Sequence, residues 1–378
     1  MSKEVTRRNF VQRLSAASAA LVALPWLASG KKEDPEPTNK ATMNPIQRSF
    51  PLGFQWETQD PFLFCVHHED QFPKGNEQMG PDAENFKGRH MGDDFIIKDG
   101  FRMYHGKKVP GFPGHPHRGF ETITVVRKGM VDHADSLGAA GRYGNGDVQW
   151  MTAGKGVQHS EMFPLLSLTE ENPLELFQVW LNLPKKDKMV EPHFKMLWRE
   201  SIPNLKFDSD KVLVELISGT WNENQGGSPP PDSWAFPKEN EVLIVNIKME
   251  PNAKITLPKA TGSVNRSLFF YEGESLTINE QTFESYSGFF LDPAVVTELE
   301  SHDTPVSLFL LQGKPIAEQV MQYGPFVMNT KEEIKQAFDD YHQTQFGGWP
   351  WKRYDQVHDR SKTRFALHAD GREEVKEI

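Results

Sequence analysis

Short apolar runs separated by turn-forming residues are the feature that most limits what this chain can fold into. From residue 46 onward such runs alternate with Gly, Pro, Asp and Asn, as at residues 62–66, 121–126, 174–180 and 242–247. Runs of this length, bounded by turn residues, are typical of strands rather than helices. Many short strands at this spacing predict an all-β protein, folded as a sandwich or a barrel.

One helix is predicted near the C-terminus. Thr330 can cap its first turn, and Glu333, three residues later, completes a capping box. Its apolar stripe consists of Ile334, Ala337, Phe338 and Tyr341. This spacing places the four side chains on one face of a helix.

A faint internal repeat indicates two barrels of similar design. Residues 125–131 and 269–275 each consist of a strand, a turn with Gly and a second strand, and residues 146–150 have a weaker counterpart at 287–291. Two such units, joined near residues 184–192, would explain the repeat. Chance similarity between short apolar strands is the alternative.

Composition excludes several classes of protein. The chain has a single cysteine, Cys65, so neither a disulfide scaffold nor a zinc site of several cysteines is available. Its net charge of −10 argues against a nucleic-acid-binding protein that relies on a broad basic surface. Cys65 lies in an apolar run and is expected to be a small buried side chain.

The N-terminus has the pattern of an export signal. Arg7 and Arg8, followed by Asn9 and Phe10, resemble a twin-arginine motif, and an apolar stretch at 14–27 and small residues at 28–30 follow. The apolar stretch is short for a membrane span, although an uncleaved anchor and a chance amphipathic helix are the alternatives. We expect a signal at 1–30, a flexible linker at 31–45, transient contact with the twin-arginine translocase, and a periplasmic protein without stable membrane insertion. Removal of the signal would leave a net charge of −13.

Two short clusters of polar residues carry the candidate chemistry. His115 and His117 are separated by one residue, and so are His159 and Glu161. Side chains at i and i+2 of a strand point to the same face. If the two strands are neighbours inside a barrel, three imidazoles and one carboxylate converge.

This donor set suits a divalent metal ion. Imidazole binds Fe, Ni, Cu and Zn, and the carboxylate adds a hard oxygen ligand. Four protein ligands leave positions open on an octahedral ion for oxygen, water or a chelating substrate. The alternative is four polar residues on a solvent-facing edge.

The segment around the first cluster resembles the hallmark of a known family. Residues 111–122 (GFPGHPHRGFET) are similar to the signature of the pirins, a branch of the cupins, and residues 135–138, 146–154, 159–162, 181–184 and 324–330 agree as well. The resemblance implies a bicupin, with two jelly-roll barrels packed face to face. We place the N-terminal barrel at 46–184, the C-terminal barrel at 185–328, and a helix and tail at 329–378.

The resemblance also implies one metal ion, held in the N-terminal barrel by His115, His117, His159 and Glu161. Iron(II) is expected, with Mn, Ni, Cu or Zn as alternatives. In the second barrel, counting back from Gly273 as the histidines precede Gly129 gives Lys259 and Thr261, neither a good ligand.

The chain departs from the family pattern in its export signal and in residues 70–109, which look longer than the family segment. That insertion could shape the pocket mouth, but a surface loop is favoured because loops tolerate insertions. His67, His68 and Glu69 cannot share one face of a strand and are interpreted as a turn or surface segment. Arg118 could orient an anionic substrate or form a local ion pair.

Pirins of this type resemble quercetin 2,3-dioxygenases, which open a flavonol ring with molecular oxygen. We therefore expect a monomeric oxidoreductase whose partners are a small flavonol- or catechol-type aromatic and O2. Glu161 would act as base on the substrate hydroxyl, a role that partly competes with metal ligation. The alternatives are a non-enzymatic, redox-sensitive metal-binding module for protein partners, which export disfavours, and a purely structural bicupin, which intact ligands disfavour.

Overall fold

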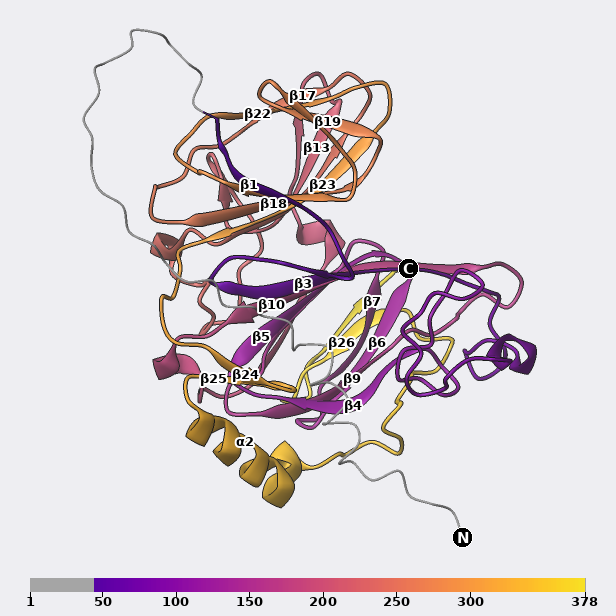
Figure 1. Cartoon of the computed structure of the whole chain (residues 1–378). Helices are drawn as coiled ribbons and strands as arrows, with labels where there is room; N and C mark the ends of the chain where they lie inside the picture. Colours follow the sequence, from indigo (N-terminus) through magenta and orange to yellow (C-terminus); the bar gives the residue numbers. More distant parts are fainter. Residues whose placement is uncertain (1–43, 378) are drawn as a thin grey trace, which may run out of the picture.

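The short apolar runs form antiparallel strands that close into two barrels, stacked one on the other (Figure 1). The structure, a computed structural model, describes residues 44–377. The expected all-β, two-barrel architecture is confirmed. The predicted signal at 1–30 and all but the last two residues of the predicted linker lie outside the described residues.

The N-terminal barrel consists of two six-stranded sheets. One sheet has the order β11 (His193–Leu197), β8 (Val148–Thr152), β5 (Phe120–Lys128), β10 (Asn172–Asn182), β3 (Phe62–Phe72) and β2 (Gln55–Trp56). The other has the order β27 (Glu373–Lys376), β26 (Arg364–Leu367), β7 (Ala140–Gly144), β6 (Met130–Asp135), β9 (Val157–Met162) and β4 (Gly111–His117).

The C-terminal barrel repeats this strand order. Its larger sheet runs β1 (Ile46–Pro51), β21 (Ser287–Leu291), β18 (Asn265–Glu272), β23 (Val306–Gly313), β16 (Leu243–Met249), β13 (Val212–Ser218) and β12 (Asn204–Phe207). Its smaller sheet runs β17 (Lys254–Leu257), β22 (Thr297–Ser301), β19 (Ser275–Ile278) and β20 (Gln281–Glu284). The order β21-β18-β23-β16 matches β8-β5-β10-β3, which shows that the faint repeat reflects two barrels of one design.

The two ends of the chain exchange barrels, which differs from the predicted boundaries. Strand β1, in the segment assigned to the N-terminal barrel, pairs with β21 of the C-terminal barrel. Strand β26, in the predicted tail, pairs with β7 of the N-terminal barrel. Figure 1 shows the indigo β1 in the upper barrel and the yellow β26 in the lower one. Both strands cover sheet edges whose backbone groups would otherwise be unpaired, and local sequence does not reveal which edge a strand joins.

An aromatic and aliphatic core joins the barrels. Phe177 of β10 stacks on Phe309 of β23, with ring centroids 4.4 Å apart and planes 13° apart. Trp56 contacts Phe269 of β18 at 4.9 Å. Cys65 is fully buried in the same core, as predicted. Alternate residues of these strands therefore face a barrel interior on one side and the partner barrel on the other.

The predicted helix is confirmed as α2 (Lys331–Thr344). Thr330 Oγ1 accepts from the Glu333 N–H, and the Glu333 carboxylate accepts from the Thr330 N–H, which completes the capping box. The helix packs against the hairpin β24 (Met321–Tyr323) and β25 (Phe326–Met328) beside the N-terminal barrel (Figure 1). Within residues 44–377 no helix is both long and apolar enough to span a membrane.

The remaining elements are short. A small hairpin consists of β14 (Thr220–Trp221) and β15 (Asn224–Gln225). The 3-10 turns are Ala83–Phe86, Lys185–Asp187, Arg199–Ser201, Lys238–Asn240 and Gln345–Gly347.

Candidate metal centre

Two neighbouring strands position the three histidines. Strands β4 and β9 pair antiparallel, and their register sets His115 opposite His159. His117 lies two residues further along β4 and therefore faces the same side as His115. One ring nitrogen from each of the three imidazoles lies within 4.8 Å of the others, and all three side chains are buried. The structure thus brings together the three imidazoles selected from their spacing.

Backbone carbonyls fix how two of these rings are presented. Nδ1 of His115 lies 3.0 Å from the Pro113 carbonyl oxygen, and Nδ1 of His117 lies 3.4 Å from that of Pro325. In each case Nδ1–H donates to the carbonyl, which leaves the Nε2 lone pair for another partner. This arrangement of a backbone acceptor behind an imidazole is typical of metal ligands.

His159 provides the test of whether an ion fits. Its side chain is fully buried, and neither ring nitrogen has a hydrogen-bond partner within residues 44–377. An unpaired buried polar group is costly. An ion between the three rings would bind one of these nitrogens, so the residues present fit a divalent metal ion.

The protonation state of the three imidazole rings is also suitable for binding a metal ion. Burial lowers the pKa of His115 to about 4. Burial, reinforced by neighbouring imidazoles, lowers the pKa of His117 and of His159 well below the usual range. The rings are therefore neutral at physiological pH, the form that binds metals.

Glu161 lies beside the triad in a network of polar side chains. Its Oε2 is 4.0 Å from Nε2 of His159 and accepts from Gln178 Nε2 at 3.1 Å. Its Oε1 contacts the hydroxyl of Thr124 at 2.8 Å and that of Tyr143 at 3.4 Å. Burial raises the pKa of Glu161, although these partners oppose the shift. Its assignment as the fourth ligand stays a prediction.

Sequence reasoning missed the residues that hold Glu161. Thr124 and Gln178 interrupt two apolar strands at positions that face the barrel interior, and Tyr143 comes from β7. The signal in the sequence that could have identified Thr124 and Gln178 is a polar residue at a position of a strand that faces the core. His133, whose ring is 5.5 Å from that of His159, belongs to a similar H-x-D pattern with Asp135.

An aromatic cavity of about 530 Å³ opens onto His115 and His117 of the triad. Its apolar walls are formed by Phe54, Phe64, Val66, Phe95, Phe112, Phe163, Leu176 and Trp180. Its polar lining includes His115, His117, Glu161, Thr124 and Gln178. A few convergent polar groups in an apolar cavity are typical of a small-molecule site.

The segment at 70–109 lines this cavity, which corrects the preference for a surface loop. It contributes Asp93, Phe95 and His105 to the walls. The interpretation of residues 67–69 as a turn or surface segment is wrong, because they lie within strand β3. His68 faces the cavity and its Nδ1 contacts the Tyr104 hydroxyl at 2.9 Å, while His67 faces the other side.

A segment after the C-terminal barrel closes one side of the site. Val327 N–H donates to the Arg118 carbonyl at 3.0 Å, and Pro325 carries the carbonyl behind His117. Arg118 itself pairs with Asp340 of α2 at 2.6 Å. Of the two roles considered for Arg118, the local ion pair is therefore the one present.

The second barrel fills the equivalent position with aliphatic side chains. Ile255 of β17 pairs with Leu299 of β22 as His115 pairs with His159. Ile255, Leu257 and Leu299 are all buried in the interior core of this barrel. Strand pairing therefore places Ile255 and Leu257 at the positions that counting back from Gly273 assigns to Lys259 and Thr261.

Two family models match the chain. The pirin model matches residues 78–181, and the model of the pirin C-terminal cupin domain matches residues 244–347. A pirin-like protein of Solanum lycopersicum is 36% identical over 252 residues, which cover 66% of this chain and 80% of the relative. Homo sapiens pirin is 35% identical over 263 residues, which cover 68% of this chain and 83% of the relative.

Other relatives carry the name of an enzyme. A Pseudomonas aeruginosa protein provisionally named quercetin 2,3-dioxygenase is 35% identical over 239 residues, which cover 62% of this chain and 79% of the relative. The crystal structure of a quercetin 2,3-dioxygenase from Acinetobacter baumannii superposes with a TM-score of 0.64 at 25% identity, and the match covers 81% of this chain and 99% of that one.

Proposed function

The chain belongs to the pirin family, and from this premise we propose that it is a metal-dependent dioxygenase acting on a flavonol- or catechol-type aromatic. The observation that carries the proposal is the combination of three neutral, buried imidazoles with an aromatic cavity of about 530 Å³. A structural metal site would not need such a cavity, and an aromatic substrate without an ion would not need three converging imidazoles.

The cavity walls would bind and orient a planar substrate. Trp180 lies 5.2 Å from His117, and Phe112 lies 6.3 Å from His115, both measured between ring centroids. An aromatic ring held among these side chains gains from their offset or edge-on packing.

Glu161 is suited to take the proton of a substrate hydroxyl. The Thr124 hydroxyl has one hydrogen but lies 2.8 Å from Glu161 Oε1 and 2.7 Å from Gln178 Oε1. When Thr124 donates to Gln178, its oxygen can accept from a proton held on Glu161 Oε1. The network therefore accommodates Glu161 with or without a proton, as a general base requires. When bound, the ion supplies a Lewis acid for chelating substrate oxygens.

We propose iron(II) as the native ion, with Mn, Ni, Cu or Zn as alternatives. Three imidazoles with a nearby carboxylate suit several first-row metals, and affinity alone would favour copper. Elemental analysis of the protein purified from its own host compartment decides between them.

The test of activity is oxygen uptake by each metal form with a panel of flavonols and catechols. We expect metal-dependent uptake that His159→Ala abolishes together with metal content, while His342→Ala, on the exposed face of α2, changes neither. Glu161→Gln separates two roles: loss of turnover with metal retained indicates a base, and loss of metal indicates a ligand. No uptake by any metal form contradicts the proposal, and capture of protein partners by one redox state alone would favour the non-enzymatic module.

We also propose export through the twin-arginine route. Its support is the sequence pattern at Arg7 and Arg8 alone. Replacement of both by lysine should leave the full-length chain in the cytoplasm, whereas the unaltered chain should appear in the periplasmic fraction in shortened form. Equal distribution of the two proteins between the fractions contradicts this proposal.

A further inference from the structure

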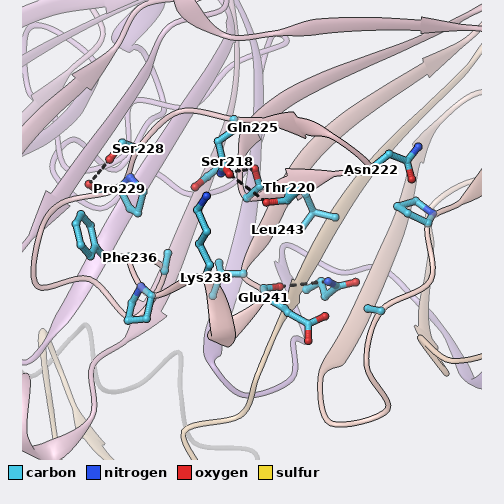
Figure 2. Close-up of a pocket in the computed structure, with 18 of the residues that line it drawn as sticks. Ser218, Thr220, Asn222, Gln225, Ser228, Pro229, Phe236, Lys238, Glu241 and Leu243 are labelled. Carbon is cyan, nitrogen blue, oxygen red and sulfur yellow. Dashed lines mark hydrogen bonds between the residues drawn. The ribbon is translucent and has the colours of Figure 1, made fainter.

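A second cavity, of about 550 Å³, lies at one end of the C-terminal barrel (Figure 2). Arg266 of β18 pairs in register with Gln312 of β23, and both line this cavity. Phe309 of β23 and Phe177 of β10 are equivalent core positions in the two barrels. Gln312 and Trp180 lie three residues further along these strands, so the pair Arg266–Gln312 corresponds to the pair Thr122–Trp180 of the N-terminal barrel. Trp180 borders the metal centre, so the two cavities occupy equivalent ends of the two barrels.

Arg266 is a buried cation that forms no ion pair within the described residues. It is 1% exposed, and its Nε and Nη2 donate to Gln312 Oε1, a neutral acceptor. Nη2 also donates to the Pro258 carbonyl at 2.8 Å. Nη1 is buried and has no hydrogen-bond partner within residues 44–377. Burial lowers the pKa of Arg266 to about 10, with Glu241 opposing the shift.

The other buried arginines differ from Arg266 because each is paired with a carboxylate. Among the described residues, Arg102, Arg118, Arg142 and Arg364 are also buried. Each forms an ion pair with a carboxylate, at distances between 2.6 and 3.0 Å. Breaking a buried pair is strongly destabilising because it leaves a charge uncompensated. Arg266 forms no such pair within residues 44–377, and only Glu241 acts on it through space, so its charge is partly compensated and an anion from outside could complete it.

The rest of the cavity lining agrees with an anionic occupant. Lys238 and Lys259 add two cations, and the single carboxylate, Glu241, already accepts from Thr261 Oγ1 at 2.6 Å. In Figure 2 the Lys238 side chain extends toward Ser218 and Gln225. The uncharged polar side chains of the lining are Ser218, Thr220, Asn222, Gln225, Ser228 and Gln312.

We propose that this cavity binds a small organic anion, whose carboxylate or phosphate group pairs with the Arg266 guanidinium at Nη1, the nitrogen that has no hydrogen-bond partner within residues 44–377. A guanidinium recognises both groups through charge-assisted hydrogen bonds. Lys238 and Lys259 provide further attraction at the cavity wall, and the hydroxyl and amide groups provide partners for polar substituents. The site is separate from the metal centre and does not depend on the proposed dioxygenase activity.

The test measures binding of malonate and of inorganic phosphate to the full chain by calorimetry and thermal unfolding, at constant ionic strength. A ligand that binds the folded state raises the unfolding temperature in a saturable way. We expect this for at least one of the two anions and not for neutral malonamide, and the stronger anion identifies the preferred group. Arg266→Gln should weaken binding by at least about tenfold, the effect of losing a hydrogen bond to a charged group.

Two further variants keep the proposal testable if Arg266→Gln does not fold. Gln312→Glu places a carboxylate where Arg266 already donates, so it should raise the unfolding temperature without ligand and abolish anion binding. Lys238→Gln with Lys259→Gln should weaken binding several-fold. The charge-matched control, Lys206→Gln with Lys248→Gln, alters exposed side chains of the same barrel outside the cavity and should bind as the unaltered chain does.

Three outcomes would overturn the proposal. Malonamide could bind as well as malonate, or anion binding could survive in Gln312→Glu. Anion binding could also vanish in His159→Ala and persist in the double lysine variant, which would place the anion at the metal centre.

Discussion

Glu121 should make the protein less stable as the pH rises from 5 to 8. The side chain is fully buried where the two barrels meet, and Ser233, in the segment between β15 and β16 of the C-terminal barrel, donates to its Oε2 at 2.6 Å. Trp150 and Thr152 donate to its Oε1 at 3.1 and 2.7 Å. These bonds lower the pKa of Glu121, but burial outweighs them and raises it from 4.5 to about 7.

The sign and size follow from proton binding. Between pH 4.5 and 7 the folded chain holds a proton on Glu121 that the unfolded chain has lost, so stability falls as pH rises. The contribution is fully present below pH 4.5 and is lost as pH rises through 7. At 1.36 kcal/mol per pKa unit, this group alone removes about 2.5 kcal/mol between pH 5 and pH 8.

The measurement compares urea unfolding of the unaltered chain and Glu121→Gln at several pH values from 5 to 8. The glutamine amide mimics the protonated acid, so the free energy of unfolding of the variant should gain about 2.5 kcal/mol relative to the unaltered chain over this range. A difference that stays constant within about 0.5 kcal/mol would refute the reasoning, because Glu121 would then be ionised throughout.

Glu175→Gln is the matched control. Burial opposes the shift, but His67 and Lys128 together lower the pKa of Glu175 to about 2. The stability that Glu175 provides is therefore present above pH 4.5 and is lost only as pH falls toward 2. Its carboxylate stays ionised between pH 5 and pH 8, so its variant should not show the gain of about 2.5 kcal/mol expected of Glu121→Gln.

Three further changes have definite expected outcomes. Gly119→Ala should destabilise the chain by more than about 2 kcal/mol in thermal or urea unfolding, because Gly119 has φ +85° and an added Cβ would lie 2.0 Å from the Val327 carbonyl oxygen. Thr330→Ala should cost about 1 kcal/mol through loss of the cap on α2, whereas Thr330→Ser should cost much less. His159→Ala should abolish metal binding, as measured by elemental analysis. It should also raise the free energy of unfolding of the metal-free chain, since it deletes a buried imidazole without a partner. A lower free energy of unfolding for the variant than for the metal-free unaltered chain would contradict that account.

The sequence determined the local features of this protein. Alternating apolar runs gave the strands, and the Thr330–Glu333 pattern gave the capped helix α2. The spacing of His115 and His117 selected residues that share one face of a strand, because side-chain direction in a strand repeats every two residues. Such features depend on residues a few positions apart, which is why pattern alone predicts them.

Only the tertiary structure decided which distant segments meet. The hydroxyl and amide groups around Glu161 come from three different strands, and the carbonyl behind His117 belongs to Pro325, 208 residues away in the chain. The exchange of β1 and β26 between barrels and the lack of an ion-pair partner for Arg266 within residues 44–377 are equally invisible along the sequence. The physical reason is that pairing energy, burial and counterion placement depend on distances in space, and two residues far apart in sequence carry no local sign of their contact.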